Sequence, residues 1–386
     1  MITRLRLIAL LARPAVIVLL IMYAAVGLAQ AGHPQDPVAA ATAVAVIAGF
    51  LLFSVACNDL ADEKIDRVNL PGKRPLAAGL LNRREFTVIG AVAGAEALAA
   101  SALISWPATL VTAAGLAVSA GYSIRPVRLA DRGAVASLVL PACYVAVPYL
   151  LGVLAARGRA GDPATLALLA GLYLGFIGRI LLKDFRDVRG DVMFGKRTFL
   201  VRHGRVATCA ISACCWLTGT AVILAATRDL TVPLTVAEAS CAGVVLVLLR
   251  ALARTANARR EEALVAATAI IGRGMLALLL AHLSMISAHS GYWGTLRYDA
   301  VIAALAAFTI GPAITMARNG PVSRCIIPAW PRSAVKAESV IWAGEAVEGL
   351  AGAAFGDFGA PSAHPRGGQV RPGPDEPLFQ VADFRL

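Results

Sequence analysis

At the end of a long apolar run, the chain reads Asn58-Asp59-Leu60-Ala61-Asp62-Glu63-Lys64-Ile65-Asp66-Arg67. Asn58, Asp62 and Asp66 recur every four residues, which places them along one face of a helix. Asp59 lies three residues before Asp62 and joins the same side. Carboxylates at this spacing repel each other by about 0.2–0.5 kcal/mol per pair, so we expect a cation to hold them together. The side-chain oxygens of these residues are hard ligands, which favour Mg²⁺.

A second acidic segment reads Leu182-Lys183-Asp184-Phe185-Arg186-Asp187-Val188-Arg189-Gly190-Asp191. It also follows an apolar run, and Asp187 and Asp191 are again four residues apart, with Asp184 one turn earlier. A solvated charged loop is the alternative, but a loop does not explain four-residue phasing at the ends of two apolar runs. Two such carboxylate ladders facing each other would bind a diphosphate through Mg²⁺, which combines a few protein carboxylates with phosphate oxygens.

The composition indicates a polytopic membrane protein. Of the 386 residues, 58% are hydrophobic and 16% charged, against about 45–50% and about 25% in soluble domains. The net charge of +12 is spread between apolar runs rather than gathered in one patch, so we expect no nucleic-acid partner. The seven cysteines form no CxxC pair and are expected to be small buried hydrophobes. The five histidines show no metal-ligand spacing, so a zinc site is not expected.

Ten apolar runs of about 17–25 residues are long enough to cross a bilayer. They lie near residues 14–30, 38–57, 86–105, 108–124, 134–155, 164–182, 207–226, 232–249, 263–287 and 300–316. The last run is the weakest of the ten, so nine or ten spans result. We therefore expect an all-α membrane helix bundle of about nine transmembrane helices, formed by residues 1–317. Residues 318–386 are rich in Pro, Gly and Ala and are expected to form a disordered tail.

Basic residues orient these spans. The connections on one side carry most of the Arg and Lys, whereas the other side has only Arg157, Arg159, Arg228 and Arg297. The positive-inside rule then predicts that the Asp-rich helix ends are cytoplasmic. Frequent Ala and Arg indicate a GC-rich bacterial source, so the expected location is the bacterial inner membrane, as a multi-pass protein.

The two acidic segments resemble the NxxxDxxxD and DxxxD motifs of the UbiA superfamily of membrane prenyltransferases. Residues 67–79 also match the family's pattern, and residues 183–198 are similar to its homogentisate and geranylgeranylglyceryl-phosphate branches. The likeness extends over about residues 4–310. It implies Mg²⁺-dependent transfer of a prenyl group from an isoprenoid diphosphate to an aromatic or similar lipophilic acceptor within the membrane. The predicted partners are therefore these two substrates and the lipid bilayer, and no obligate protein partner is predicted.

The motifs and this resemblance together predict the site residues. Those expected to bind Mg²⁺ directly or through water are Asn58, Asp59, Asp62, Asp66, Asp184, Asp187 and Asp191. Asp59 and Asp184 are equally expected as hydrogen-bond acceptors for Lys or Arg. The aspartates expected to be catalytic, with one of them taking up a proton from the acceptor, are Asp62, Asp66, Asp187 and Asp191.

Basic residues beside the motifs are expected to bind diphosphate oxygens. They are Arg13, Arg67, Lys73, Arg74, Arg125, Arg128 and Lys183. The family usually has a basic residue shortly after the Tyr-Ser pair that here is 122–123. Ala130 and Asp131 stand there instead, so Arg128 or Arg132 is expected to substitute.

Aromatic side chains are expected to line the prenyl and acceptor pocket and to stabilise an allylic cation with their π faces. They are Phe53, Tyr122, Tyr144, Tyr149 and Tyr173, and core packing is the alternative for each. Arg273 and Glu96 lie inside apolar runs, where a charge is expected to face a cavity or partner, or to pair locally.

Three other functions stay open at this point. A membrane terpene cyclase would use the same motifs to ionise a prenyl diphosphate without an acceptor. A transporter predicts polar residues along a path through the membrane, whereas these carboxylates gather at one face. A structural membrane subunit would tolerate Asp62→Asn without functional loss.

Overall fold

A computed structural model describes residues 13–31, 37–69, 74–193, 197–227, 229–255 and 257–289, together with Leu7, Leu11, Gly195, Ala307 and Gly311. The expected tail, 318–386, and nearly all of the tenth apolar run lie outside the described residues. Within the described part, every regular element is helical. The elements are α2 (Pro14–Gln30), α3 (Pro37–Ala61), α4 (Glu63–Asn69), α5 (Arg83–Ile104), α6 (Trp106–Ser123), η1 (Leu129–Asp131), α7 (Ala134–Pro141), η2 (Ala142–Ala146), α8 (Val147–Ala155), α9 (Pro163–Ile180), η3 (Leu181–Lys183), α10 (Asp184–Met193), α11 (Phe199–Ala226), α12 (Val232–Arg254) and α13 (Ala258–His289).

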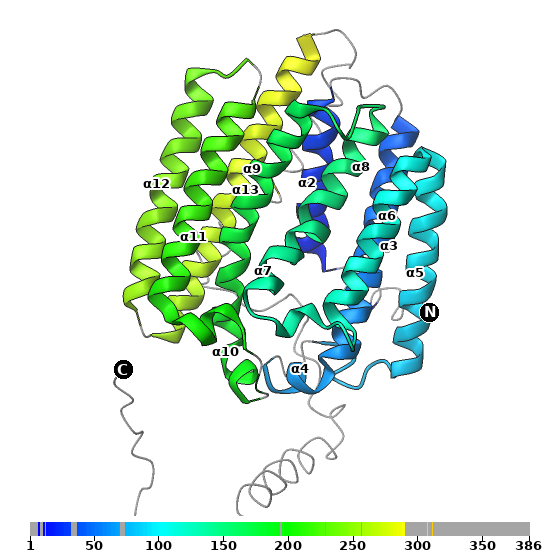
Figure 1. The fold of residues 1–386 in the computed structure, drawn as a ribbon, viewed down its shortest axis with the longest axis vertical. Helices are drawn as coiled ribbons and strands as arrows, with labels where there is room; N and C mark the ends of the chain where they lie inside the picture. The colour runs from blue at the N-terminus through cyan, green and yellow to red at the C-terminus, as the bar shows by residue number, and fades with distance from the viewer. Residues whose placement is uncertain are drawn as a thin grey trace, which may run out of the picture. The chain divides into compact units, whose positions relative to one another are not determined.

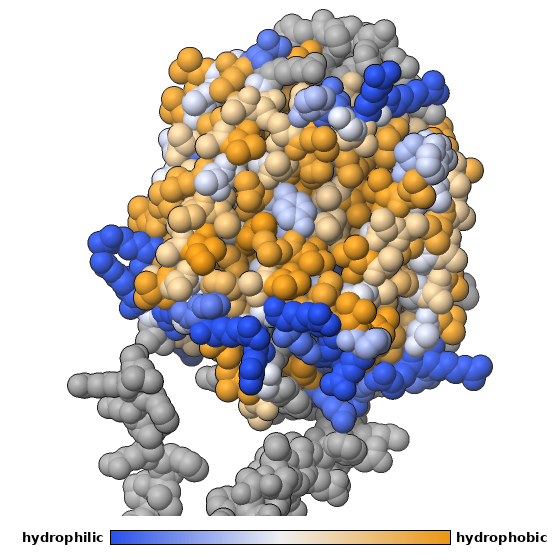
Figure 2. Space-filling model, viewed as in Figure 1, coloured by the Kyte–Doolittle hydropathy of each residue, from blue (hydrophilic) through white to orange (hydrophobic). Residues whose placement is uncertain are grey.

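The expected all-α membrane bundle is confirmed. Seven helices of the described part are long and apolar enough to span a bilayer: α3, α5, α7 with α8, α9, α11, α12 and α13. The apolar helix α2 is shorter, and α6 carries a proline and several hydroxyl side chains among its 18 residues. Figure 2 shows an apolar band across one face, with hydrophilic residues gathered at the two ends. An apolar surface of this extent is typical of a protein that sits in lipid.

The helices pack in two groups that share α2 and α8 (Figure 1). Met22 and Val26 of α2 belong to a core with α8, α9 and α13. Leu20 and Ala24 of the same helix belong to a second core with α3, α6 and α8. Because adjacent residues of α2 point to opposite groups, this short helix is buried on most of its circumference and joins the two halves.

Glycines allow two of these helix contacts to be very close. A Cβ at Gly152 of α8 would lie 1.9 Å from the carbonyl oxygen of Ala24 in α2. A Cβ at Gly171 of α9 would lie 2.8 Å from the backbone nitrogen of Ile223 in α11. Small residues at helix crossings are the usual means of close packing within membranes.

The span from residue 134 to 155 contains a π-helical turn, Ala142–Ala146, between α7 and α8. Pro148 has no N–H to donate to the carbonyl of Tyr144, four residues earlier, and its ring crowds that carbonyl. Widening of the helix at this point relieves the conflict. The turn lies in the middle of the span and carries Tyr144.

Candidate active site

The first acidic segment lies where α3 ends. Ala61 is the last residue of α3, Asp62 forms a bend, and α4 begins at Glu63. The backbone hydrogen-bond pattern nevertheless continues across the bend. The N–H of Asp62 donates to the carbonyl of Asn58 (2.9 Å), and the N–H of Asp66 donates to the carbonyl of Asp62 (2.8 Å). The four-residue phasing read from the sequence therefore persists.

The aspartates of this segment are buried: Asp59 is 2% exposed, Asp62 9% and Asp66 7%. Buried carboxylates need hydrogen-bonding or cationic partners. Arg13, just before α2, donates to Asp59 over 2.6 Å, and Arg74, between α4 and α5, reaches the same oxygen over 3.2 Å. Arg74 also lies 3.6 Å from Asp66.

Asp62 has its own cationic partner. Arg128, in the segment after α6, donates to a carboxylate oxygen of Asp62 over 2.7 Å and to the carbonyl of Ala61 over 3.3 Å. It also bonds to Asp131. Asp131 stands where the family usually has a basic residue, and it holds the guanidinium that reaches Asp62. The other proposed substitute, Arg132, instead donates to the carbonyl of Val127.

Two of these arginines have left-handed backbones, with φ of 48° at Arg13 and 35° at Arg128. Non-glycine residues in this region carry strain of about 1–3 kcal/mol, which clusters at functional sites. Burial alone would lower the pKa of Arg13, but the attractions of Asp59, Tyr144 and Asp66 together outweigh it, so that this pKa is raised. Both guanidinium groups are donors held beside carboxylates.

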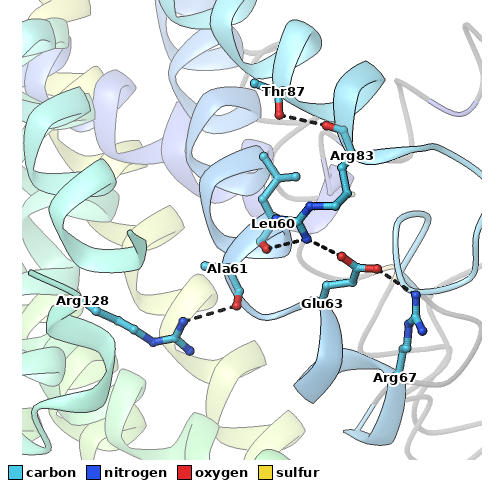
Figure 3. Close-up of polar contacts among 7 residues, drawn as sticks. All are labelled: Leu60, Ala61, Glu63, Arg67, Arg83, Thr87 and Arg128. Atoms are coloured by element: carbon cyan, nitrogen blue, oxygen red, sulfur yellow. Dashed lines mark hydrogen bonds and ion pairs between the residues drawn. The ribbon is translucent and has the colours of Figure 1, made fainter. Parts of the chain in front are cut away.

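Glu63 belongs to the same segment but binds other arginines, and Figure 3 shows its carboxylate away from Arg128. Its carboxylate binds Arg83 of α5 and, over 2.8 Å, Arg67 of α4. Arg83 also donates to the carbonyl of Leu60 over 3.3 Å. Arg67, predicted to bind diphosphate, is thus placed on the outer side of the segment, and its side chain is 45% exposed.

The second acidic segment forms η3 and α10. Asp191 is 1% exposed and Asp184 is half-buried, whereas the side chain of Asp187 lies outside the described part. Helices α4 and α10 lie side by side at one end of the bundle, which we call the acidic end (Figure 1). The expectation that segments four helices apart in sequence meet at the same end is thus met by the structure.

Tyr122 lies between the two acidic segments. Its buried hydroxyl is within electrostatic range of Asp62 from the first segment and of Lys183 and Asp184 from the second. A small pocket is lined by Tyr122, Lys183 and Asp184 together with Leu140 of α7. Lys183 itself is exposed. Two further predicted cations are not in this group: Arg125 is exposed after α6, and Lys73 lies outside the described residues.

Of the other predicted aromatics, Tyr144 lies on the π-helical turn in the middle of its span. It stacks on Phe176 of α9, with ring centroids 5.8 Å apart, and lies within electrostatic range of Arg13. The remaining three are placed in helix contacts. Phe53 packs against Gly94 of α5, and the hydroxyls of Tyr149 and Tyr173 donate to the carbonyls of Thr165 and Leu138, respectively.

The donor chemistry of the acidic end fits magnesium, because carboxylates of two adjacent helices supply hard oxygen ligands. In the described residues, however, no three acidic, His or Cys side chains are arranged around one ion position. The aspartates of the first segment instead bind arginines. The residues match Mg²⁺ in kind.

Several polar or aromatic residues inside the spans were missed by the sequence analysis. They are Arg179 of α9, Trp216 of α11 and Glu238 of α12, which line one cavity together with Phe176. The signal for Arg179 and Glu238 was present, since each is an ionisable residue inside an apolar run. Arg273 and Glu96, which the sequence singled out, lie on α13 and α5, and Glu96 is exposed beside Gly49.

Comparison with known proteins agrees with this architecture. The model of the UbiA prenyltransferase family matches residues 18–271, about two thirds of the chain. The chain belongs to the UbiA prenyltransferase family. Both α4 and α10 lie within the matched residues.

Relatives of this UbiA protein are named for different enzymes. It is 33% identical over 245 residues to protoheme IX farnesyltransferase of Anaeromyxobacter sp., covering 63% of this chain and 80% of the relative. It is 28% identical over 153 residues to the bacteriochlorophyll synthase 34 kDa chain of Chloroflexus aurantiacus, covering 40% and 48%. It is 31% identical to digeranylgeranylglyceryl phosphate synthase of Thermococcus gammatolerans, covering 42% and 59%. The chain thus spans only about half the length of the last two relatives.

Solved structures share the fold. A structure of digeranylgeranylglyceryl phosphate synthase superposes with a TM-score of 0.57 at 18% identity, covering 73% of this chain and 99% of that one. A UbiA homolog from Archaeoglobus fulgidus bound to DMAPP and Mg²⁺ gives a TM-score of 0.51 at 18% identity, covering 71% and 98%.

Proposed function

We propose that this protein transfers a prenyl group, in a Mg²⁺-dependent reaction, from an isoprenoid diphosphate to a lipophilic acceptor within the membrane. The observation that carries the proposal is the meeting of two buried acidic helix ends, α4 and α10, beside fixed arginines. The relatives' names and the Archaeoglobus fulgidus homolog bound to DMAPP and Mg²⁺ support it.

The residues that would hold Mg²⁺ are Asn58, Asp62 and Asp66 from the first segment and Asp187 and Asp191 from the second. When bound, Mg²⁺ neutralises the diphosphate and makes it a better leaving group. Asp59, which binds two arginines in this structure, serves to position Arg13 and Arg74. Of its two proposed roles, accepting hydrogen bonds from arginine is the one its contacts support.

Arg128, Arg74 and Arg13 are the chain's diphosphate donors in this proposal. Each now contacts a carboxylate of the first segment. A diphosphate offers the same guanidinium groups a more highly charged acceptor, for which arginine's fork of donors is well suited. If the arginines exchange their carboxylate contacts for contacts with the diphosphate, the carboxylate oxygens become free to bind the metal. The prenyl diphosphate and Mg²⁺ are therefore expected to bind together.

The helix bundle is expected to stabilise the allylic cation and to shield it from water. Tyr144 and Tyr122 lie near the acidic end, where their π faces can stabilise positive charge as the C–O bond breaks. The apolar helices exclude water, which would otherwise capture the cation. An aspartate of the acidic end takes the proton that the alkylated acceptor loses. We place the acidic end on the cytoplasmic side of a bacterial inner membrane, because the basic connections gather there.

The first test is an assay of membranes that contain the protein. Geranyl, farnesyl and geranylgeranyl diphosphate are supplied in turn, with Mg²⁺ or with EDTA, and with or without a lipid extract of the host. We expect Mg²⁺-dependent diphosphate release with one of these donors, together with a prenylated lipid when the extract is present. A cyclic hydrocarbon or alcohol formed from the donor alone would instead show a terpene cyclase. No release from any of the three donors would contradict both activities.

A further inference from the structure

Arg205 of α11 contacts three other helices at the acidic end. Its Nη2 lies 2.6 Å from a carboxylate oxygen of Glu261 on α13. Its Nη1 donates a hydrogen bond to the carbonyl of Leu252 on α12 over 3.3 Å, and its guanidinium carbon lies 5.3 Å from the centre of the Phe185 ring in α10. We call these four residues the Arg205 cluster. One side chain thus connects α10 to the three helices that follow it.

The three contacts of Arg205 use different properties of its guanidinium group. The Leu252 carbonyl belongs to the last turn of α12, where carbonyls have no partner within the helix and a cation is favoured. Glu261 is in the first turn of α13, and its side chain is only 12% exposed; a carboxylate is favoured at that end of a helix. A guanidinium is planar, so it can lie over the Phe185 ring while its edge donates to both oxygens. Lysine has the charge but not the flat face, so the three contacts together specify arginine.

Phe185 connects the cluster to the second acidic segment. It follows Asp184 directly, is 6% exposed, and belongs to a hydrophobic core with Leu249 and Leu252 of α12. At 3.6 residues per turn, position 191 lies about 240° around α10 from position 185, so Asp191 and Phe185 are on different sides of the helix. Helix α10 contacts α4 as well as α11 and α13. A contact that fixes Phe185 therefore fixes the rotation of α10, and with it the side that carries Asp191.

The backbone immediately before Arg205 also fixes the position of this residue. Gly204 has φ of 76° and ψ of 176°, so α11 has a kink between residues 199–203 and the long part of the helix that begins with Arg205. This region of backbone conformation is accessible essentially only to glycine. Thr208, one turn later, donates its hydroxyl to the Gly204 carbonyl over 2.7 Å. A Cβ at Gly204 would have no atom within 4 Å, so Gly204→Ala would act on the kink alone.

We infer that Arg205 is a positioning residue for the second metal-binding segment. Through Phe185 it holds α10 in one rotation against α11, α12 and α13, so that the side of α10 that carries Asp191 is fixed before the metal–diphosphate group binds. The effect of Arg205 on the metal rests on the proposed prenyl transfer, whereas its hold on α10 can be measured in protein without substrate.

The hold on α10 is measured by hydrogen–deuterium exchange of detergent-purified, full-length protein without metal or substrate. We expect the amides of α10 to exchange about tenfold faster in Arg205→Met than in the wild type, because loss of the charged contacts allows this helix to open locally. Gly204→Ala should act in the same direction, and Arg205→Lys should give an intermediate rate. Helix α5, which packs on α3 and α6 in the other group of helices, should exchange as in the wild type.

The matched control is Arg250→Met, which removes the same charge from an exposed position two residues before Leu252. It should leave the exchange of α10 unchanged.

The Mg²⁺ requirement of diphosphate release provides a second readout. In Arg205→Met the Mg²⁺ concentration for half-maximal release should rise about tenfold, the lower end of the roughly 10–100-fold effect of residues that orient metal ligands. The rate per folded protein at saturating Mg²⁺ should stay within a few-fold of the wild type, because Arg205 is not among the proposed diphosphate donors. A purely structural role would lower the yield of folded protein and leave the Mg²⁺ requirement unchanged.

Unchanged exchange of α10 in Arg205→Met, or faster exchange that extends equally to α5, would overturn the inference whatever the activity of the protein. An unchanged Mg²⁺ requirement of this variant in an active enzyme would also overturn it. Failure of the wild type to release diphosphate from any donor would instead contradict the proposed function, and the exchange measurement would still decide whether Arg205 holds α10.

Discussion

Alanine in place of Asp62 is expected to reduce Mg²⁺-dependent diphosphate release by about 10²–10³-fold, the range found when one group that stabilises transition-state charge is removed. Asp62 is buried midway along the ladder from Asn58 to Asp66 and is bonded by Arg128. The same loss is expected for Asp187→Ala, because α10 lies beside α4. Release is measured with purified protein and the best donor from the membrane assay.

Glu63→Ala is the matched control for this loss. Glu63 is the next residue along the chain, but its carboxylate binds Arg67 and Arg83 on the outer side of the segment (Figure 3). We expect Glu63→Ala to retain release within a few-fold of the wild type. Removal of Asp62 leaves Arg128 bonded to Asp131 and to the carbonyl of Ala61, so the variant should still fold. Normal turnover by both Asp62→Ala and Asp187→Ala would reject the proposed chemistry.

Methionine in place of Arg128 is expected to lower kcat/KM for the prenyl diphosphate by about 10²-fold, a typical effect of losing one preorganised donor. Arg128 is the residue that contacts Asp62, Asp131 and the carbonyl of Ala61 at once. Lysine keeps the charge but lacks the planar fork, so Arg128→Lys should give an intermediate value. Rates are measured per folded protein over a range of donor concentrations.

Arg84→Met controls for loss of a positive charge at the acidic end, because Arg84 is exposed on the first turn of α5. It should leave kcat/KM within a few-fold of the wild type. A merely structural Arg128 predicts that Arg128→Met keeps the wild-type kcat/KM once the rate is expressed per folded protein. A kcat/KM per folded protein equal to that of the wild type would therefore contradict the proposed role of Arg128.

Local patterns predicted the parts of this structure that repeat along the chain. The spacing of carboxylates four residues apart at the ends of apolar runs predicted the two acidic helix ends. The length of the apolar runs predicted the membrane helices. Even the bend at Asp62 leaves the hydrogen bonds from Asn58 to Asp66 in phase. Helix periodicity and hydrophobic length are properties of neighbouring residues, so one sequence is enough to show them.

Contacts between distant segments could not be predicted in the same way. The sequence proposed seven cations for the diphosphate, and nothing local distinguished Arg13, Arg74 and Arg128, which reach the carboxylates, from Arg67, which points outward. Their selection depends on how α2, α5 and α6 pack around the end of α3. The left-handed backbone of Arg128 is likewise not indicated by its residue type.

The residues that line the cavity show a second limit of prediction from sequence, which concerns burial. Glu238 and Arg179 satisfy the rule that singled out Glu96, since all three are ionisable residues within apolar runs. The sequence does not tell which of them is buried. In the structure Glu238 is inside the bundle and Glu96 is on its surface, because the helix face that carries each residue is decided by the neighbours on α12 and α5.

The claim on which the account depends is that the two acidic segments bind one metal–diphosphate group together. Mn²⁺ in place of Mg²⁺ allows a direct measurement, by electron paramagnetic resonance, of ion binding to the purified protein with an unreactive prenyl thiodiphosphate. We predict that the analogue strengthens Mn²⁺ binding to the wild type, and that Asp62→Ala and Asp187→Ala each abolish this gain. Undiminished, analogue-dependent Mn²⁺ binding in either variant would contradict a shared site.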